Sequence, residues 1–260
     1  MDISLSGKHA LVGGSTQGIG KAAAIELANL GARVTLLARN ETSLKEVLAE
    51  LPADQGHDYL VADFSTPEEV QSTVRSYLET HAPFHILVNN TGGPPGGQAI
   101  EADIAEFERA YRMHLICNHL LAQTLVPGMK EAGYGRIINV ISTSVKIPIT
   151  GLGVSNTTRG AVASWAKTLA NELGQFGITV NNVLPGFTAT ERLFSLLAVW
   201  AKQQGISSDE MQSKMESSVP AKRIGDPSET ANAIAFLASP AASYVNGINL
   251  PVDGGRTGAL

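Results

Sequence analysis

Gly13-Gly14-Ser15-Thr16-Gln17-Gly18-Ile19-Gly20 joins a short apolar run at residues 9–12 to a segment with helical spacing. Backbone amides must come close to a bound pyrophosphate, and the following helix must begin tight against the strand, so side chains are unfavourable in such a turn. The free N–H groups and partial positive charge of the helix N-terminus then favour an anion. The stretch therefore predicts a nucleotide-phosphate cradle between a strand and a helix, with Gly14, Gly18 and Gly20 as its spaced glycines.

Short apolar runs alternate with helical segments along the whole chain. Strands are expected at residues 9–12, 33–37, 59–62, 85–88, 136–141, 179–183 and 247–250. Helices are expected between them, at about 19–30, 44–51, 67–81, 104–130, 159–176 and 227–237. Such alternation implies crossover connections and a parallel sheet covered on both faces. We therefore predict one doubly wound α/β domain, a Rossmann fold, over residues 1–260.

Composition narrows the classes of partner. The 260 residues carry a formal net charge of −5 with acidic and basic residues mixed, which argues against nucleic acid. No apolar run approaches the roughly 20 residues of a membrane span, and residues 1–8 lack the features of a signal peptide. Cys117 is the only cysteine, so no internal disulfide and no cysteine-based metal site is expected. We expect a cytoplasmic protein that uses a small-molecule substrate, without nucleic acid, membrane or metal.

The glycine spacing resembles that of the short-chain dehydrogenase/reductase family, and further motifs extend the resemblance over about residues 5–255. The turn Asn89-Asn90-Thr91-Gly92, the acidic Asp63, the pair Pro185-Gly186 with Thr190, and Val252-Asp253-Gly254-Gly255 match family motifs in the same order. Gly13 in place of Thr, and Thr91 in place of Ala, are mild departures. The resemblance implies a nicotinamide dinucleotide bound by Gly14, Ser15, Thr16, Gly18, Ile19, Gly20, Arg39, Asp63, Phe64, Asn90, Gly92, Pro185, Gly186, Thr188 and Thr190.

The end of the second expected strand bears on which dinucleotide is bound. An NAD enzyme of this type needs a carboxylate there to accept from the ribose 2′-hydroxyl, and that carboxylate repels a 2′-phosphate. Here Ala38 removes the repulsion, and Arg39 supplies a planar donor suited to phosphate. Ser15 and Thr16 add hydroxyl donors. We therefore predict NADP(H) rather than NAD(H); the alternative is that Arg39 is a solvated loop residue.

The reaction end departs from the family pattern. A typical member uses a Tyr as proton donor, a Lys four residues later, a Ser that binds the substrate oxygen, and an Asn that organises a water chain. The matching positions here are Ser155, Arg159, Ser142 and His114, so only the Ser is retained. A Ser hydroxyl is a far weaker acid than a phenol, and Arg159 stays charged and cannot pass protons onward. His114 is expected to titrate near neutrality, unless neighbours satisfy it as a structural residue.

Three alternatives remain open for this site. In the first alternative, Arg159 and Ser142 polarise a carbonyl for hydride transfer, while water, His114 or the substrate supplies the proton. Another phenol, Tyr111 or Tyr134, replaces the missing Tyr. The third alternative is a redox-inactive scaffold or sensor that binds the dinucleotide. We expect the first, a carbonyl reductase or alcohol dehydrogenase in the style of 3-oxoacyl reductases.

Two further segments bear on substrate and assembly. Residues 188–219 carry a cluster of apolar side chains where the family has a lid, so a small, apolar substrate is expected, although the cluster would also suit plain packing. The small-residue face Ala161, Ala163, Ala166 and Ala170 would let helices approach closely, as in the family's dimer interface. The resemblance implies a homotetramer or homodimer.

Overall fold

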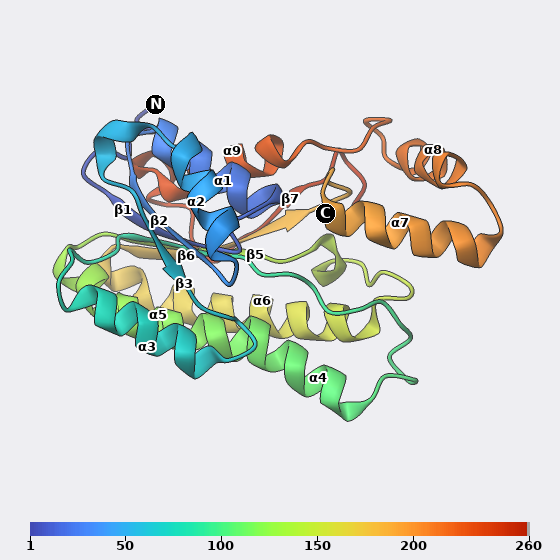
Figure 1. Cartoon of the computed structure of the whole chain (residues 1–260), viewed down its shortest axis with the longest axis horizontal. Helices are drawn as coiled ribbons and strands as arrows, with labels where there is room; N and C mark the ends of the chain where they lie inside the picture. The colour runs from blue at the N-terminus through green and yellow to red at the C-terminus, as the bar shows by residue number, and fades with distance from the viewer. Residues whose placement is uncertain (259–260) are drawn as a thin grey trace.

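A parallel sheet runs through the centre of the computed structural model, which describes residues 1–258 (Figure 1). Within those residues the sheet has seven strands in the order β3-β2-β1-β4-β5-β6-β7. The strands are β1 His9–Gly13, β2 Arg33–Ala38, β3 Asp58–Val61, β4 Ile86–Asn89, β5 Gly135–Val140, β6 Ile178–Pro185 and β7 Asn249–Val252. The strand order reverses between β1 and β4, and a crevice opens at such a point, beyond the carboxyl ends of the strands.

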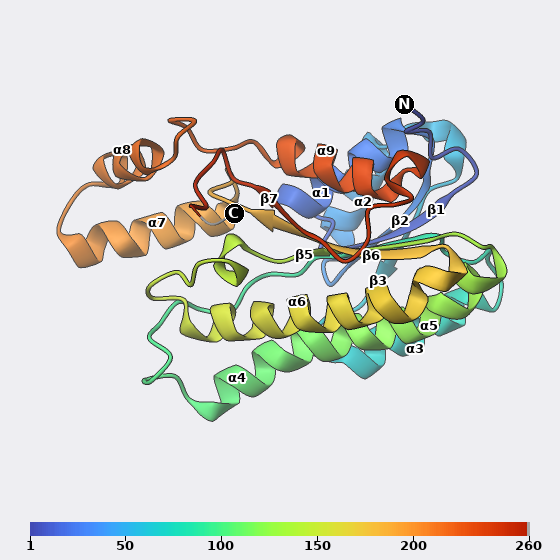
Figure 2. The same cartoon turned by 180° about the vertical axis from the view of Figure 1, so that it is seen from behind.

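Helices cover both faces of the sheet (Figures 1 and 2). One layer holds α1 Gly18–Asn29, α2 Glu41–Glu50 and α9 Pro227–Ala238; the other holds α3 Pro67–Leu78, α4 Ile104–Tyr111, α5 Cys117–Glu131 and α6 Gly153–Leu173. Side chains of a strand alternate between these layers: Ala10 and Val12 of β1 pack in the first core, and Leu11 packs in the second. The predicted doubly wound α/β fold is confirmed.

Helix α6 begins at Gly153, ahead of the predicted start at residue 159. The run before Arg159 is polar and β-branched, which indicates a loop because such hydroxyls compete for backbone groups. In the structure these hydroxyls bond within the helix, since Thr157 Oγ1 donates to the Gly153 carbonyl and Thr158 Oγ1 to the Val154 carbonyl. As a consequence Ser155 and Arg159 lie one turn apart on the same helix face.

Three of the four alanines predicted to face a second subunit are buried within the chain. Ala163, Ala166 and Ala170 are at most 8% exposed and pack inside the chain against the sheet layer. These three alanines are therefore not available to a second subunit, while Ala161 is half-buried and its predicted contact stays a prediction. Small side chains are needed here because the helix lies close over β6, with which it makes extensive contact.

The predicted helix over residues 104–130 is interrupted. Residues Arg112–Ile116 form a π-helical turn between α4 and α5, and His114 lies in that turn. Single π turns inside α-helices widen the backbone locally and are frequent at functional sites. None of the helices in residues 1–258 is long and apolar enough to cross a membrane.

The segment predicted as a lid forms two helices, α7 Glu191–Gln204 and α8 Ser208–Ser218, which project beyond the carboxyl edge of the sheet (Figure 1). Thr190 caps α7 by accepting from the Leu193 N–H. The two helices share a small apolar core of their own, made of Leu193, Leu197, Ala201, Met211 and Met215. This core orients the first turn of α7 over the crevice.

Candidate functional site

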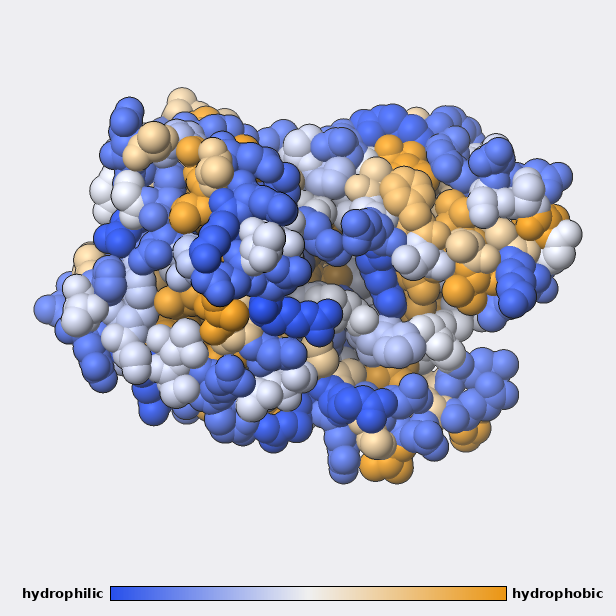
Figure 3. Space-filling model, in the orientation of Figure 1, coloured by the Kyte–Doolittle hydropathy of each residue, from blue (hydrophilic) through white to orange (hydrophobic). Residues whose placement is uncertain are grey.

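A cleft of about 540 Å³ opens at the carboxyl edge of the sheet, walled by the loops that follow β1, β2, β4, β5 and β6 and by α7. The space-filling view shows the surface hollowed there, with apolar surface of the α7–α8 region beside the hollow (Figure 3). The cleft spans both predicted ends of the site. Its phosphate end lies at the glycine turn, and its reaction end lies between Ser142, Ser155 and α7.

At the phosphate end, the glycine turn has no room for side chains. Gly14 has φ +57°, and a Cβ there would lie 2.7 Å from the Asn90 carbonyl oxygen. A Cβ on Gly20 would lie 2.1 Å from the Gly14 carbonyl oxygen, so α1 begins in direct contact with the turn. Asn90 Nδ2 donates to the carbonyls of Gly13 and Gly14 at 3.2 and 3.3 Å. The exposed backbone of this turn and the N-terminus of α1 together suit a pyrophosphate.

Arg39 and Asn40 follow β2 at the far end of the same wall. No carboxylate ends β2; the position is occupied by the buried Ala38. The Arg39 side chain is 80% exposed, and its Nη1 lies 4.0 Å from Oδ2 of Asp63. Thr16, in the turn after β1, and Ser43, in the first turn of α2, line the same cleft. This group of a guanidinium, two hydroxyls and a helix N-terminus fits a 2′-phosphate.

Ser15 and Gly20, both predicted to bind the cofactor, do not line the cleft. The Ser15 side chain is fully buried, and its Oγ accepts from the Leu37 N–H at 3.0 Å, so it ties the turn to β2. The predicted hydroxyl donation from Ser15 to a cofactor therefore does not fit its placement. The other predicted cofactor residues do line the cleft: Gly14, Thr16, Gly18, Ile19, Arg39, Asp63, Phe64, Asn90, Gly92, Pro185, Gly186, Thr188 and Thr190.

At the reaction end, Ser142, Ser155 and Arg159 face the same cleft. Ser142 follows β5, and its Oγ accepts from the Ser144 N–H at 3.1 Å, which leaves the hydroxyl proton free to donate. Arg159 Nε donates to Ser155 Oγ at 3.2 Å, and Nη1 donates to the Val140 carbonyl at 3.1 Å. Burial, with a smaller contribution from Arg192, lowers the pKa of Arg159 to about 10, so the group is still a cation at neutral pH.

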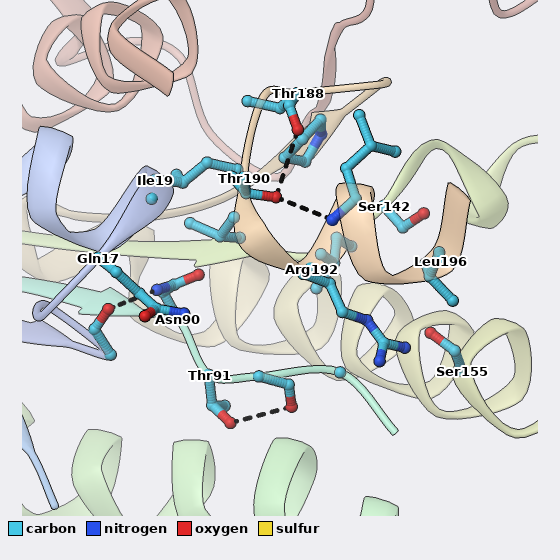
Figure 4. A pocket seen from close by; sticks show the side chains of 18 of the residues that line it. Gln17, Ile19, Asn90, Thr91, Ser142, Ser155, Thr188, Thr190, Arg192 and Leu196 are labelled. Atoms are coloured by element: carbon cyan, nitrogen blue, oxygen red, sulfur yellow. Dashed lines mark hydrogen bonds between the residues drawn. The ribbon is translucent and has the colours of Figure 1, made fainter. Parts of the chain in front are cut away.

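Arg192, which the sequence analysis did not identify, joins this group from the first turn of α7. Its guanidinium Nη2 donates to the Pro94 carbonyl, and Figure 4 shows the side chain directed toward Ser155, away from Gln17 and Ile19. Burial lowers its pKa. The available signal was a cation two residues after Thr190, at the start of an otherwise apolar cluster.

His114 does not behave as predicted. Its side chain is 4% exposed and does not line the cleft. Burial, followed by the charges of Arg159 and Arg192, lowers its pKa to about 3. The expectation that His114 titrates near neutrality is therefore wrong, because the imidazole is neutral there. Nε2 is buried and has no hydrogen-bond partner among the described residues, so the ring stays available as a weak donor or acceptor inside the wall.

Neither candidate tyrosine lies at the site. The Tyr134 hydroxyl donates to the Ala238 carbonyl at 2.6 Å, between β5 and α9, and Tyr111 lies outside the cleft with 47% of its surface exposed. Among residues 1–258 no Tyr, Lys, His or Cys lines this cleft. The alternative in which Tyr111 or Tyr134 takes the place of the missing Tyr is therefore wrong.

Comparison with known proteins shows the family to which this chain belongs. The family model described as enoyl-(acyl carrier protein) reductase matches residues 14–257. The chain belongs to the short-chain dehydrogenase/reductase family. It is 33% identical over 253 residues to the 3-oxoacyl-[acyl-carrier-protein] reductase FabG of Vibrio cholerae, covering 97% of this chain and 98% of that protein. It is also 30% identical to the 7alpha-hydroxysteroid dehydrogenase of Escherichia coli K12, over 98% of this chain and 96% of the relative.

The solved structures give the same family. L-sorbose reductase from Gluconobacter frateurii, complexed with NADPH and L-sorbose, superposes with a TM-score of 0.93 at 33% identity, over the full length of both chains. YwfH, an NADPH dependent reductase involved in bacilysin biosynthesis, gives 0.92 at 27% identity, over 98% of this chain and 100% of its own. The family resemblance and the expectation of an oxidoreductase are confirmed.

Proposed function

We propose that the protein is an NADP(H)-dependent reductase of carbonyl compounds whose reaction end relies on Ser142, Ser155 and Arg159. The observation that carries the proposal is the single cleft, in which a glycine cradle and Arg39 at one end face a hydroxyl and a buried guanidinium at the other. A cleft of this form brings a dinucleotide and a small polar group together. The related sorbose reductase and YwfH are both described with NADPH.

The cofactor assignment rests on fit at two places. A Cβ at Gly14 would lie 2.7 Å from the Asn90 carbonyl oxygen, so glycine holds the turn against Asn90 in a position where an anion can approach its exposed N–H groups. At the other place, Ala38 stands where a carboxylate would select NAD(H), Arg39 follows it, and Thr16 and Ser43 add hydroxyl donors to the same cleft. NADP(H) fits both places, with its pyrophosphate at the glycine turn and its 2′-phosphate beside Arg39.

Bound NADPH supplies a hydride at its nicotinamide ring. The Ser142 hydroxyl donates a hydrogen bond to the substrate carbonyl oxygen, and the nearby Arg159 cation stabilises the negative charge that develops there. As the carbonyl carbon gains the hydride, the π-electron pair moves to the oxygen, which takes a proton from water in the cleft to give the alcohol. Arg159 does not transfer this proton, because it stays a cation at neutral pH.

Ser155 has a positioning role in this scheme. Its Oγ accepts from Arg159 Nε at 3.2 Å, so it fixes the plane of the guanidinium one helical turn away. Fixed, desolvated dipoles and charges are worth more than mobile ones because no reorganisation is needed as charge develops. The Ser155 proton is also free for a hydrogen bond toward the cleft.

The described residues place no phenol and no ammonium in the cleft, which favours a second candidate, a nucleotide-binding protein that catalyses no reaction. Titration with NADPH and NADH, followed by fluorescence, tests the cofactor. A panel of ketones, aldehydes and acyl thioesters, followed at the nicotinamide absorbance, tests the reaction. Binding with oxidation supports the reductase; saturable NADPH binding without oxidation supports the second candidate; no binding contradicts both.

We also propose a homotetramer or homodimer, with a cytoplasmic location. Ile104 and Tyr111 on α4 are large apolar side chains with 73% and 47% of their surface exposed, and such surface is commonly covered in an assembly. Light scattering of the purified protein tests the assembly: a monomer at micromolar concentration would contradict it.

A further inference from the structure

Two arginines converge on one point at the reaction end. A Cβ placed on Gly93 would lie 3.3 Å from Nη2 of Arg159, 3.6 Å from Nη2 of Arg192 and 3.8 Å from its Nε. The missing side chain at Gly93 therefore leaves room between the two guanidinium groups. They come from different elements, since Arg159 belongs to α6 and Arg192 to α7.

No carboxylate of the described residues forms an ion pair with either arginine. Among residues 1–258 no carboxylate lies within 4.0 Å of either guanidinium. Asp63 is the one acidic residue of the described chain that lines the cleft, and it lies beside Arg39 at the opposite end. Two neighbouring cations without a partner are unfavourable, and the cost rises as water is excluded.

Both groups keep donors for a ligand. Arg159 uses Nε for Ser155 and Nη1 for the Val140 carbonyl, which leaves Nη2 uncommitted among the described residues. Arg192 uses Nη2 for the Pro94 carbonyl, which leaves its other N–H groups. A guanidinium has five N–H donors in a fixed plane, an arrangement that matches the oxygens of a carboxylate or a phosphate.

The location separates this pair from the cofactor's phosphates. Thr190, two residues before Arg192, has its Cγ2 3.0 Å from where a Gly18 Cβ would lie, so it faces the glycine turn. The Arg192 side chain points the other way, toward Ser155 (Figure 4). On the same side of the cleft, Leu193, Leu196 and Trp200 form an apolar wall.

We propose that the substrate carries an anionic group, a carboxylate or a phosphate ester, which Arg159 and Arg192 bind together beside the reacting carbonyl, while its apolar part lies against α7. This deepens the proposed function and rests on it. It replaces the expectation of a purely apolar substrate with that of an amphipathic oxo acid.

The test is equilibrium binding, which needs no turnover. NADP⁺-saturated protein, and protein without cofactor, is titrated by calorimetry with 4-phenyl-2-oxobutanoate and with its uncharged amide; neither can react with NADP⁺. The acid binds at least about tenfold more tightly than the amide, because hydrogen bonds to a charged group are strengthened by the charge. The phosphate monoester of 1-hydroxy-4-phenylbutan-2-one, which keeps the ketone and the apolar part, is titrated in parallel, and the tighter binder identifies which anion the pair takes.

Substitutions on α7 assign the effect to the pair. Arg192→Gln weakens the acid about tenfold and leaves the amide unchanged, and Arg192→Lys keeps part of the preference because it retains the charge. Lys202→Gln is the matched control: it removes the same charge from the same helix, outside the cleft, and leaves both affinities unchanged.

The outcomes separate this inference from the proposed function. Equal binding of acid and amide, equal loss of both in Arg192→Gln, or no binding of either anion would overturn the inference, even if neutral ketones are reduced. Selective binding of an anion without any NADPH oxidation would support the inference and contradict the proposed reductase.

Discussion

The two ends of the cleft follow different rules. At the phosphate end backbone N–H groups would bind the cofactor, and the chain keeps the family's glycines at Gly14, Gly18 and Gly20. At the reaction end side chains would act on the substrate, and the resemblance drawn from the sequence assigns Ser155, Arg159 and His114 to the positions of the family's Tyr, Lys and Asn. A fold therefore preserves the site made of its own backbone, while the chemistry carried on side chains changes over the same framework.

The two ends of the cleft also differ in the electrostatic surroundings of their arginines. Arg39 at the phosphate end is exposed and has Asp63 within 4.0 Å, so water and a carboxylate both moderate its charge. Arg159 at the reaction end is half-buried with no carboxylate of residues 1–258 within 4.0 Å, and desolvation lowers its pKa to about 10. A substitution at the phosphate end should change cofactor binding, and one at the reaction end should change substrate binding or turnover while cofactor binding is kept.

The largest effect is expected from Gly14→Ala. The new Cβ would lie 2.7 Å from the Asn90 carbonyl oxygen and displace the turn that forms the cradle, so NADPH binding falls below detection by fluorescence titration. Gly7→Ala is the matched control, because Gly7 has φ +74° with nothing within 4 Å. Both variants carry a left-handed Ala, which costs about 1–2 kcal/mol, but only the first displaces the cradle. Tight NADPH binding by Gly14→Ala would show that the glycine turn is not needed for cofactor binding.

Arg159→Lys tests the reaction end. A lysine retains the charge but cannot bond Ser155 and the Val140 carbonyl in one plane, so kcat falls about 10²–10³-fold while the Kd for NADPH stays within error. Arg75→Lys on the exposed face of α3 is the control for the exchange itself. An unchanged kcat would mean that the fork of donors at Arg159 plays no part in the reaction.

His114→Asn gives the next effect, on acid stability. The native pKa is lowered to about 3, so the unfolded chain binds a proton that the folded chain does not, and stability falls as pH drops from about 6.5 toward 3. Between pH 7 and pH 5 the wild type loses about 2 kcal/mol more than the variant, taking 6.5 as the unfolded value. Urea unfolding at the two pH values measures this; parallel losses in both proteins would show that His114 is not buried as a neutral ring.

Arg39→Ala gives the smallest effect, because the side chain is 80% exposed. Its loss weakens NADPH about tenfold and leaves NADH unchanged, since only the former has a phosphate to contact. Lys202→Ala removes a charge elsewhere and serves as the control. If NADPH and NADH weaken together, cofactor choice does not depend on Arg39.

The phosphate end could be predicted from the sequence, because a backbone that must come close to a pyrophosphate requires glycine at fixed positions in the turn. The strands could be read as apolar runs, and their predicted ends differ from the structure by a few residues. Ser15 shows the limit even here: spacing places it in the turn, but only the structure shows its Oγ bonded to the Leu37 N–H rather than facing the cleft.

The reaction end could not be read in the same way. Arg192 reaches the site because the core shared by α7 and α8 sets the direction of the first turn, and no local pattern encodes that direction. The neutrality of His114 depends on burial within a π turn and on two arginines distant in sequence. The position of Ser155 one turn before Arg159 followed from a helix start that its polar residues obscured.

The most direct measurement follows hydride itself. NADPH carrying deuterium at the hydride-donating carbon of the nicotinamide is incubated with the protein and with oxo acids, neutral ketones, aldehydes and acyl thioesters, and the products are analysed by mass spectrometry. The account predicts an alcohol with the deuterium on its carbinol carbon, formed by the wild type and about 10²–10³-fold more slowly by Arg159→Lys. NADPH that binds tightly but transfers deuterium to no compound of the panel would contradict the claim that this altered site is a working reductase.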